Sequence, residues 1–252
     1  MIWNWEEFLI GHKNPSQRRD LSKFLLVLSV FALNLSSLSA QDQLVWNQVG
    51  IVVNDGYGSD LVDLLDSFYG SIDLPEGVSI SLTQVYHSDE DHKATHYMTF
   101  SGTAAGLTEL RQLRSGAEYD NYSTNFSKYG QTISNSIGSS VIRLNTDSTD
   151  GNIAQVWEWR VEDVFAFVDA FNRMTSVWSP DGYLSLGAIT GGQSVEGESH
   201  YVYTTYSGYQ EMLEFGPKTE EEQAAFFNFI KETDAYSEFK GTFSMFNVKS
   251  WN

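Results

Sequence analysis

One short phrase occurs twice in this chain, and a repeat of this kind restricts the fold more than any other feature of the sequence. The first occurrence spans residues 95–102 and the second spans 199–208, and each contains His-Tyr near its start and ends in Ser-Gly. The second histidine follows the first by 104 positions, which is too long for a solenoid repeat and suits a duplicated domain. Two further pairs of segments keep nearly the same offset: 61–68 with 164–171, and 77–82 with 182–187. We therefore predict two copies of one folding unit.

Each copy is expected to contain strands and helices in the order βαββαβ, which is the ferredoxin-like split motif. In the first copy, helical spacing predicts helices after Ser59 and near Ala104, and alternating apolar residues predict strands at 45–53, 78–82, 96–100 and 140–144. In the second copy, a capping box at Thr219 opens the last helix. Its other elements are a helix at 163–178 and strands at 156–161, 183–190, 200–206 and 242–249.

The predicted layout has four parts. They are a signal peptide at 1–40, a first repeat at 41–145, a polar linker at 146–153 and a second repeat at 154–252. A ferredoxin-like unit covers one face of its sheet with helices and leaves the other face open. Two such units can bury their open faces against each other, so the sequence predicts an α+β fold in which two tandem repeats form a pseudo-dimeric α+β barrel.

In its element order and duplication the chain resembles the dimeric α+β barrel superfamily. This superfamily includes antibiotic-biosynthesis monooxygenase-like proteins and related heme-handling and isomerase families. The resemblance covers nearly all of the chain after residue 40 and implies an intramolecular pseudo-dimer. It rests on no diagnostic motif, so no catalytic residue of the superfamily can be assigned to a position here.

The N-terminal segment has the features of an export signal. Basic side chains precede an apolar run at 24–33, and small residues follow as far as Ala40. The run is too short to span a bilayer, so we expect a periplasmic or secreted protein with no membrane anchor after cleavage. Arg18 and Arg19 leave open a twin-arginine export route. A start codon assigned too far upstream is the other alternative.

Charge and composition exclude several classes of function. The formal net charge is −18, which repels nucleic acid and anionic membrane surfaces. The chain has no cysteine and therefore no disulfide, thiol nucleophile or cysteine-based metal site. It also lacks a phosphate-binding glycine loop, a complete dinucleotide fingerprint, His-Glu-x-x-His and Gly-x-Ser-x-Gly. The sequence identifies no cofactor.

Strand alternation predicts which side chains line the shared interior of the barrel. If the apolar residues of each strand face helices, the residues between them face the other repeat. Hydroxyl groups beside aromatic rings suit a small-molecule pocket, so we predict a ligand-binding set: Gln48, Ser81, Thr83, Glu158, Tyr183 and Tyr201. The alternative is that these residues satisfy one another or lie at solvated edges.

A loop rich in histidine and carboxylate is a candidate metal site. Imidazole and carboxylate together can hold a divalent ion. The candidate ligands are His87, Asp89, Asp91, His92 and His96. Their spacing matches no standard metal motif, so a solvated acidic turn is the alternative.

Three residues are candidates for catalysis. His96 and His200 occupy the same place in the two repeats, and either could act as a general base with Arg160 nearby. The simpler interpretations are an inherited strand opening for the histidines and a structural ion pair between Glu158 and Arg160. Our main hypothesis is a non-catalytic protein that binds a small apolar or aromatic ligand or serves in interactions. The alternatives are a cofactor-free or heme-assisted enzyme of the antibiotic-biosynthesis monooxygenase-like kind, and a metal-binding protein.

Overall fold

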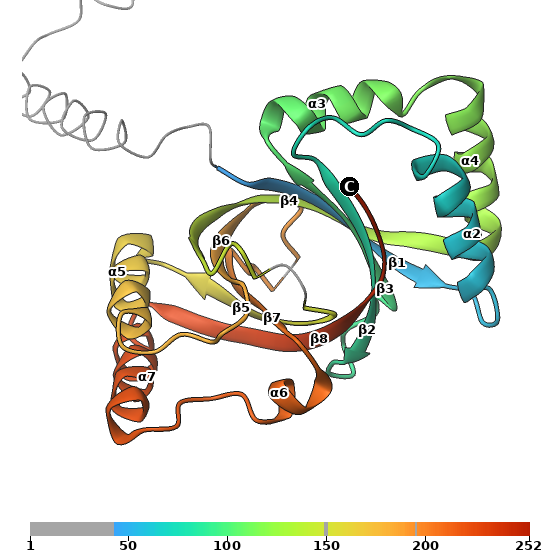
Figure 1. Ribbon diagram of the computed structural model, residues 1–252. Helices are drawn as coiled ribbons and strands as arrows, with labels where there is room; N and C mark the ends of the chain where they lie inside the picture. The colour runs from blue at the N-terminus through green and yellow to red at the C-terminus, as the bar shows by residue number, and fades with distance from the viewer. Residues whose placement is uncertain (1–42, 149–150, 195) are drawn as a thin grey trace, which may run out of the picture. The chain divides into compact units, whose positions relative to one another are not determined.

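Eight antiparallel strands close into a barrel in the order β1-β3-β2-β8-β5-β7-β6-β4, and β4 pairs back to β1 (Figure 1). The computed structural model describes residues 43–148, 151–194 and 196–252. The predicted signal peptide at 1–40 lies outside these residues. Among the described residues, no helix is both long enough and apolar enough to cross a membrane.

The first seven elements follow the predicted order, with one additional helix. They are β1 (Val45–Val53), α2 (Gly58–Tyr69), β2 (Ser79–His87), β3 (His96–Gly102), α3 (Ala104–Leu113), α4 (Gly116–Tyr129) and β4 (Gly130–Leu144). The polar stretch that contains α4 was not predicted to be a helix. Its single buried side chain is Tyr122, so the stretch carries only a narrow apolar stripe.

The remaining elements again begin with a strand and a helix. They are β5 (Ile153–Val161), α5 (Val164–Thr175), β6 (Leu184–Gly191), β7 (His200–Tyr206), α6 (Tyr209–Leu213), α7 (Glu220–Thr233) and β8 (Ser237–Trp251). The predicted capping box is present at the start of α7, where the Thr219 hydroxyl accepts from the Glu222 amide and the Glu222 carboxylate accepts from the Thr219 amide.

Two strands are longer than the sequence predicted because each pairs with a strand of its own half along one part and with a strand of the other half along another part. β4 pairs with β1 along its first ten residues and with β6 from Ile137 onward. β8 pairs with β5 along its first part and with β2 along its second part. The first part of β4 is mainly polar and exposed, so it lacks the apolar alternation on which the prediction of 140–144 depended.

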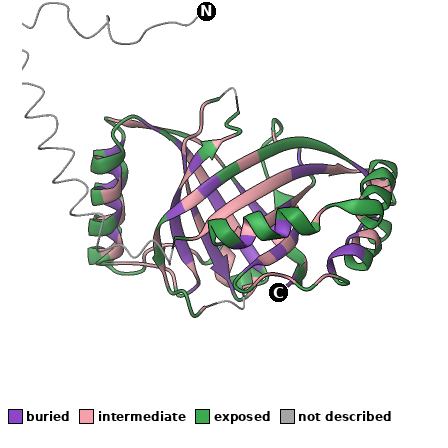
Figure 2. Cartoon of the chain, turned by 90° about the horizontal axis from the view of Figure 1, so that it is seen from above, coloured by how far each residue is buried: buried purple, intermediate pink, exposed green. Residues whose placement is uncertain are grey.

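Apolar side chains form three clusters, two outside the barrel wall and one inside it. One outer cluster joins α2 and α4 to the sheet, and the other joins α5 and α7 to the sheet. The interior cluster contains Ala154, Val156, Phe243 and Met245, with tyrosines packed against it. Figure 2 shows the resulting burial pattern: the helices are buried toward the barrel and exposed on their outer sides.

Candidate functional site

The α5 and α7 side of the barrel contains a cavity of about 350 Å³ between the helices and the sheet. We call it the aromatic cavity because eight of its sixteen lining residues are aromatic: Trp157, Trp159, Phe171, Trp178, Phe215, Phe226, Phe229 and Phe239. Its volume lies within the range of small-molecule sites, which are mostly apolar with a few polar groups. The cavity can therefore hold a small, flat, apolar molecule.

The rings of the aromatic cavity contact one another around its wall. The Phe215 ring centroid lies 5.2 Å from Trp157 and 5.4 Å from Trp178, and Phe226 packs edge-on against Trp178 at 5.8 Å. Aromatic pairs at these separations and angles hold each other in place. Phe215 comes from the connection between α6 and α7, so this connection closes one side of the cavity.

The polar lining residues gather where α7 ends and β8 begins. Thr233 and Ser237 each donate a hydroxyl hydrogen bond to the backbone, to Phe229 and Thr233 carbonyls respectively. Asp234 caps the C-terminus of α7, where the helix dipole disfavours a negative charge, and it is the only ionisable residue among the described lining residues. The aromatic cavity is therefore apolar along its length, with one carboxylate at the α7–β8 end.

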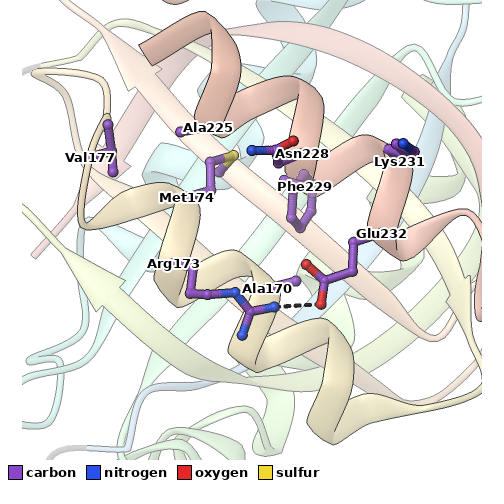
Figure 3. Close-up of a pocket in the computed structure, with 9 residues that line it drawn as sticks. All are labelled: Ala170, Arg173, Met174, Val177, Ala225, Asn228, Phe229, Lys231 and Glu232. Carbon is purple, nitrogen blue, oxygen red and sulfur yellow. Dashed lines mark hydrogen bonds and ion pairs between the residues drawn. The ribbon is translucent and has the colours of Figure 1, made fainter. Parts of the chain in front are cut away.

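A second hollow, the outer groove of about 500 Å³, lies on the outward side of the same helix pair (Figure 3). Arg173 of α5 bridges the groove to Glu232 of α7, with an N–O distance of 2.5 Å, and also pairs with Asp169. Met174 and Phe229 line both the outer groove and the aromatic cavity. These two side chains thus separate the cavity from solvent along the seam between the helices.

The predicted ligand-binding residues lie on the other face of the sheet, inside the barrel. Gln48 reaches Thr99 with its amide, and the Thr83 hydroxyl lies 3.0 Å from the Met245 sulfur. Ser81, Glu158, Tyr183 and Tyr201 also alternate with residues that face the helices. The structure brings the six residues to one face, where tyrosines and Phe243 share the space. Their role in binding stays a prediction.

Glu158 has the most perturbed carboxyl group of the barrel interior. Burial, together with the negative charges of Glu198 and Asp89, raises the pKa of Glu158 to about 7. It does not pair with Arg160 as expected: the Arg160 guanidinium lies 2.6 Å from Glu238, and both of these side chains are about half-exposed. The expectation was wrong because Glu238 of β8 lies directly opposite Arg160 in the strand register and offers it a carboxylate across the strands.

The structure does not gather the candidate metal ligands. His87 Nδ1 lies 2.8 Å from the Ser244 hydroxyl, and His92 Nε2 lies 3.1 Å from the Tyr97 hydroxyl. Asp89 accepts hydrogen bonds from the amides of Asp91 and His92, which stabilises the turn. In the part of the chain that the structure describes, no group of three or more histidine or carboxylate side chains is placed to hold a metal ion.

The two matched histidines do not line the aromatic cavity. His200 is buried on the helix-facing side of β7, with Nδ1 2.9 Å from the Ser199 hydroxyl and its ring 6.3 Å from Phe167. His96 is half-buried, and its Nδ1 lies 3.0 Å from the Thr95 hydroxyl. Burial lowers the pKa of both histidines, so both imidazoles are neutral at pH 7.

Comparison with known proteins finds similarity in three dimensions only. No family model and no curated protein matches the sequence. A candidate monooxygenase from Lactobacillus acidophilus NCFM is similar in structure, with a TM-score of 0.56, 15% identity, and coverage of 83% of this chain and 96% of that chain. An anthrone oxidase-like protein is similar with a TM-score of 0.53, 12% identity, and coverage of 84% and 94%.

A third solved structure is a heme-binding protein from Thermus thermophilus. Its TM-score is 0.51 at 10% identity, and the match covers 82% of this chain and 91% of that chain. These proteins belong to the dimeric α+β barrel superfamily. The described chain has the dimeric α+β barrel fold. The resemblance predicted from the sequence is therefore confirmed at the level of fold.

The expectation of a non-catalytic binding or interaction protein is wrong. The solved structures that share this dimeric α+β barrel are monooxygenase-like and heme-binding proteins, which favour the enzyme alternative. The sequence reasoning also missed the aromatic cavity. Its rings come from β5, the end of α5, the α6–α7 connection, α7 and β8, and aromatic residues at helical spacing indicate a core in most proteins. The sequence signal that could have indicated the cavity is the spacing of Trp157 and Trp159, which places two large rings on the same face of β5.

Proposed function

We propose that the protein is a cofactor-free enzyme of the monooxygenase-like kind, which oxidises a small aromatic substrate with molecular oxygen. The observation that carries the proposal is the aromatic cavity with its single ionisable group, Asp234, at one end. The solved structures with the same fold include a candidate monooxygenase and an anthrone oxidase-like protein, which supports this class of reaction.

The lining favours a flat aromatic substrate with one polar edge. Tryptophan and phenylalanine rings offer large apolar faces, and stacked or edge-on contacts add to the free energy of area burial. The polar groups lie together at the α7–β8 end, around Asp234. A substrate therefore binds with its apolar rings among Trp157, Trp178 and Phe226 and its acidic hydrogen toward the carboxylate.

Asp234 is placed to accept a proton from the substrate. Removal of a proton from a methylene carbon between aromatic rings leaves an electron-rich carbanion or enolate, which can react with oxygen without a cofactor. For an anthrone-like ketone, the methylene group and one O₂ become a carbonyl group and one water, so atoms and electrons balance. The apolar rings surround the part of the anion that lies away from Asp234, whose carboxylate is exposed at the end of the cavity.

The residues of the aromatic cavity do not fit heme, which is the other group suggested by the fold. Protein ligands to heme iron are histidine, cysteine, methionine with histidine, or tyrosine. Among the described lining residues, Met174 offers the single atom of this kind. His200 does not line the cavity, so it is not placed beside Met174 as a second ligand. We therefore derive no step through heme.

We also propose that the two halves descend from one duplicated βαββαβ unit and that the protein is exported. The shared phrase supports the first proposal, because His96 begins β3 and His200 begins β7. Gly50 pairs with Tyr97 in one half, and Glu158 pairs with Tyr201 at the matching point of the other. Export rests on the basic and apolar pattern of the N-terminal sequence.

The proposed function is tested with anthrone as the probe. Purified protein in metal-free buffer is expected to consume oxygen and to form the corresponding quinone in equal amounts. Asp234→Asn, which keeps the size of the side chain, should lower kcat by about 100-fold or more while the KM changes little, because a general base contributes about 10²–10⁴-fold.

The matched control is Glu221→Gln, which removes an exposed carboxylate from the first turn of the same helix. It should leave both kcat and KM unchanged. If Asp234→Asn oxidises anthrone at the wild-type rate, Asp234 is not the general base. Absence of any oxygen uptake with anthrone and with related hydroxylated tricyclic ketones would overturn the proposed reaction.

A further inference from the structure

A half-buried arginine lies in the helix layer opposite to the aromatic cavity. Arg114 ends α3, and its side chain packs against the outer cluster of α2 and α4, on the far side of the barrel from α5 and α7 (Figure 1). Its guanidinium carbon lies 4.7 Å from the Phe100 ring centroid and 5.4 Å from that of Tyr119. Its Nη2 donates to the Tyr119 hydroxyl at 3.1 Å. The contacts are to rings and a phenol.

This cation has no counter-charge among the residues that the structure describes. Of the ion pairs formed there, none includes Arg114. The groups that act on it electrostatically are the phenol hydroxyls of Tyr69, Tyr119 and Tyr122. A charge removed from water without an opposite charge is costly. Cation–π contacts with the surrounding ring faces offset part of this desolvation cost.

Two buried donors at this place have no acceptor within the described chain. They are Arg114 Nε and the hydroxyl of Tyr69, a residue that is 1% exposed. The Tyr122 hydroxyl acts on the Tyr69 oxygen as a donor, so the proton of the Tyr69 hydroxyl remains without an acceptor. Burial raises the pKa of Tyr69 to about 12, so the hydroxyl keeps its proton at pH 7 and can donate. An unmade bond of a buried donor costs more than an average hydrogen bond contributes.

We propose that Arg114 and Tyr69 form a binding site for a small carboxylate. A guanidinium presents donors in a fork that matches the two oxygens of a carboxylate, and Nε belongs to that fork. The Tyr69 hydroxyl supplies a further donor, and the Phe100 and Tyr119 rings favour an acid with an aromatic group. The site is independent of the proposed oxidation, since the aromatic cavity lies in the other helix layer.

The alternative is that Arg114 serves only in packing. A binding role and a packing role predict different effects on the Tm when the Tyr69 hydroxyl is removed. In carboxylate-free buffer, Tyr69→Phe should raise the Tm, because it removes an unpartnered buried donor. With saturating carboxylate, the wild type should have the higher Tm, because it gains a hydrogen bond that Tyr69→Phe cannot make. A packing role predicts no such crossing of the two Tm curves.

The experiment is a titration of the full chain with benzoate and with acetate, followed by thermal unfolding at constant ionic strength adjusted with chloride. Wild-type Tm should rise by about 3 to 5 °C when benzoate exceeds its Kd tenfold. Arg114→Met keeps the apolar stem and should abolish the rise. Arg111→Met removes an exposed charge one turn earlier in α3 and should leave the rise intact.

Tyr69→Phe keeps the test decisive if Arg114→Met fails to fold. Two results together support the site. The benzoate-dependent rise in Tm should persist in Arg111→Met, and the Kd for benzoate should be about fivefold higher in Tyr69→Phe than in the wild type, a factor expected for one hydrogen bond. The site is overturned by a wild-type Tm that does not respond to benzoate or acetate. An equal rise with chloride alone, or an equal rise in Tyr69→Phe, also overturns it.

Discussion

The two helix layers solve the same packing problem in different ways. On the α2 and α4 side, Phe68 stacks on Tyr122 with ring centroids 4.9 Å apart, and Tyr69 packs edge-on against both rings. On the α5 and α7 side, Phe171 occupies the position that matches Phe68 in the repeated segments, but it lines the aromatic cavity. One layer is closed by direct ring contacts, and the other leaves space between its rings. The proposed oxidation is thus confined to one half of the barrel.

The largest expected effect tests this contrast through stability. Phe68→Ala should lower the free energy of unfolding by about 3 to 5 kcal/mol, the usual cost of deleting a buried phenylalanine ring. Phe171→Ala should cost less, about 2 to 3 kcal/mol, because one side of its ring already faces empty volume and fewer contacts are lost. Urea denaturation of both variants measures the difference. Equal losses would mean that the aromatic cavity is closed in solution.

A second difference lies inside the barrel, where Gly50 and Glu158 hold matching positions opposite Tyr97 and Tyr201. The folded-state pKa of Glu158, about 7, is above the ordinary value of 4.5. Between these two pH values the folded protein holds a proton that the unfolded chain has lost. The free energy of unfolding is therefore highest below pH 4.5 as far as Glu158 is concerned, and it falls as the pH rises to 7. The fall should be about 2 to 3 kcal/mol.

Denaturation at a series of pH values checks this decrease. Glu158→Gln cannot ionise and should flatten the profile between pH 5 and 7, while Glu198→Gln should reduce the decrease only in part, because Glu198 acts on Glu158 through its charge. A wild-type profile that is flat over this range, or one that rises, would show that Glu158 remains hydrated in the folded protein.

Ligand binding should separate the two layers by a smaller margin. Phe126 of α4 and Phe226 of α7 are both partly buried against their outer clusters, but only Phe226 lines the aromatic cavity. Phe226→Ala should weaken anthrone binding about tenfold, which corresponds to about 1.4 kcal/mol, because an aromatic contact with the ligand is lost. Phe126→Ala should leave the Kd unchanged. Quenching of tryptophan fluorescence measures both, and equal weakening would place the ligand elsewhere.

The fold was more predictable from the sequence than the candidate site. Strand alternation is a local property, so β1 and β7 were predicted with their observed bounds, and the helix-facing positions of Ile51 and Leu82 followed from the same alternation. The extra length of β4 and β8 depends on pairing between the halves, which no local pattern reveals. The aromatic cavity is harder still to predict, because a helix layer that encloses a cavity and one that is closely packed contain the same residue types. Only the relative positions of Phe171, Trp178 and Phe215 distinguish them.

The smallest effect concerns how a ligand reaches the aromatic cavity. Arg173 and Glu232 tie α5 to α7 across the outer groove (Figure 3), while Met174 and Phe229 lie between that groove and the cavity. An exposed ion pair contributes little to folding, so Arg173→Gln should hardly change the urea midpoint. It should instead increase the rate of anthrone association, because the two helices can separate more easily along the seam.

Stopped-flow fluorescence measures that rate, and salt provides an independent check. High ionic strength screens exposed charges, so it should raise the association rate of the wild type toward that of Arg173→Gln while leaving the variant unchanged. Asp169→Asn is the matched control, since it removes the partner of Arg173 within α5 and keeps the bridge to Glu232. If the wild type and Arg173→Gln associate at the same rate at low salt, the ligand enters by another route. The end of the cavity near Asp234 would then be the next place to test, because that residue lines the cavity and is exposed.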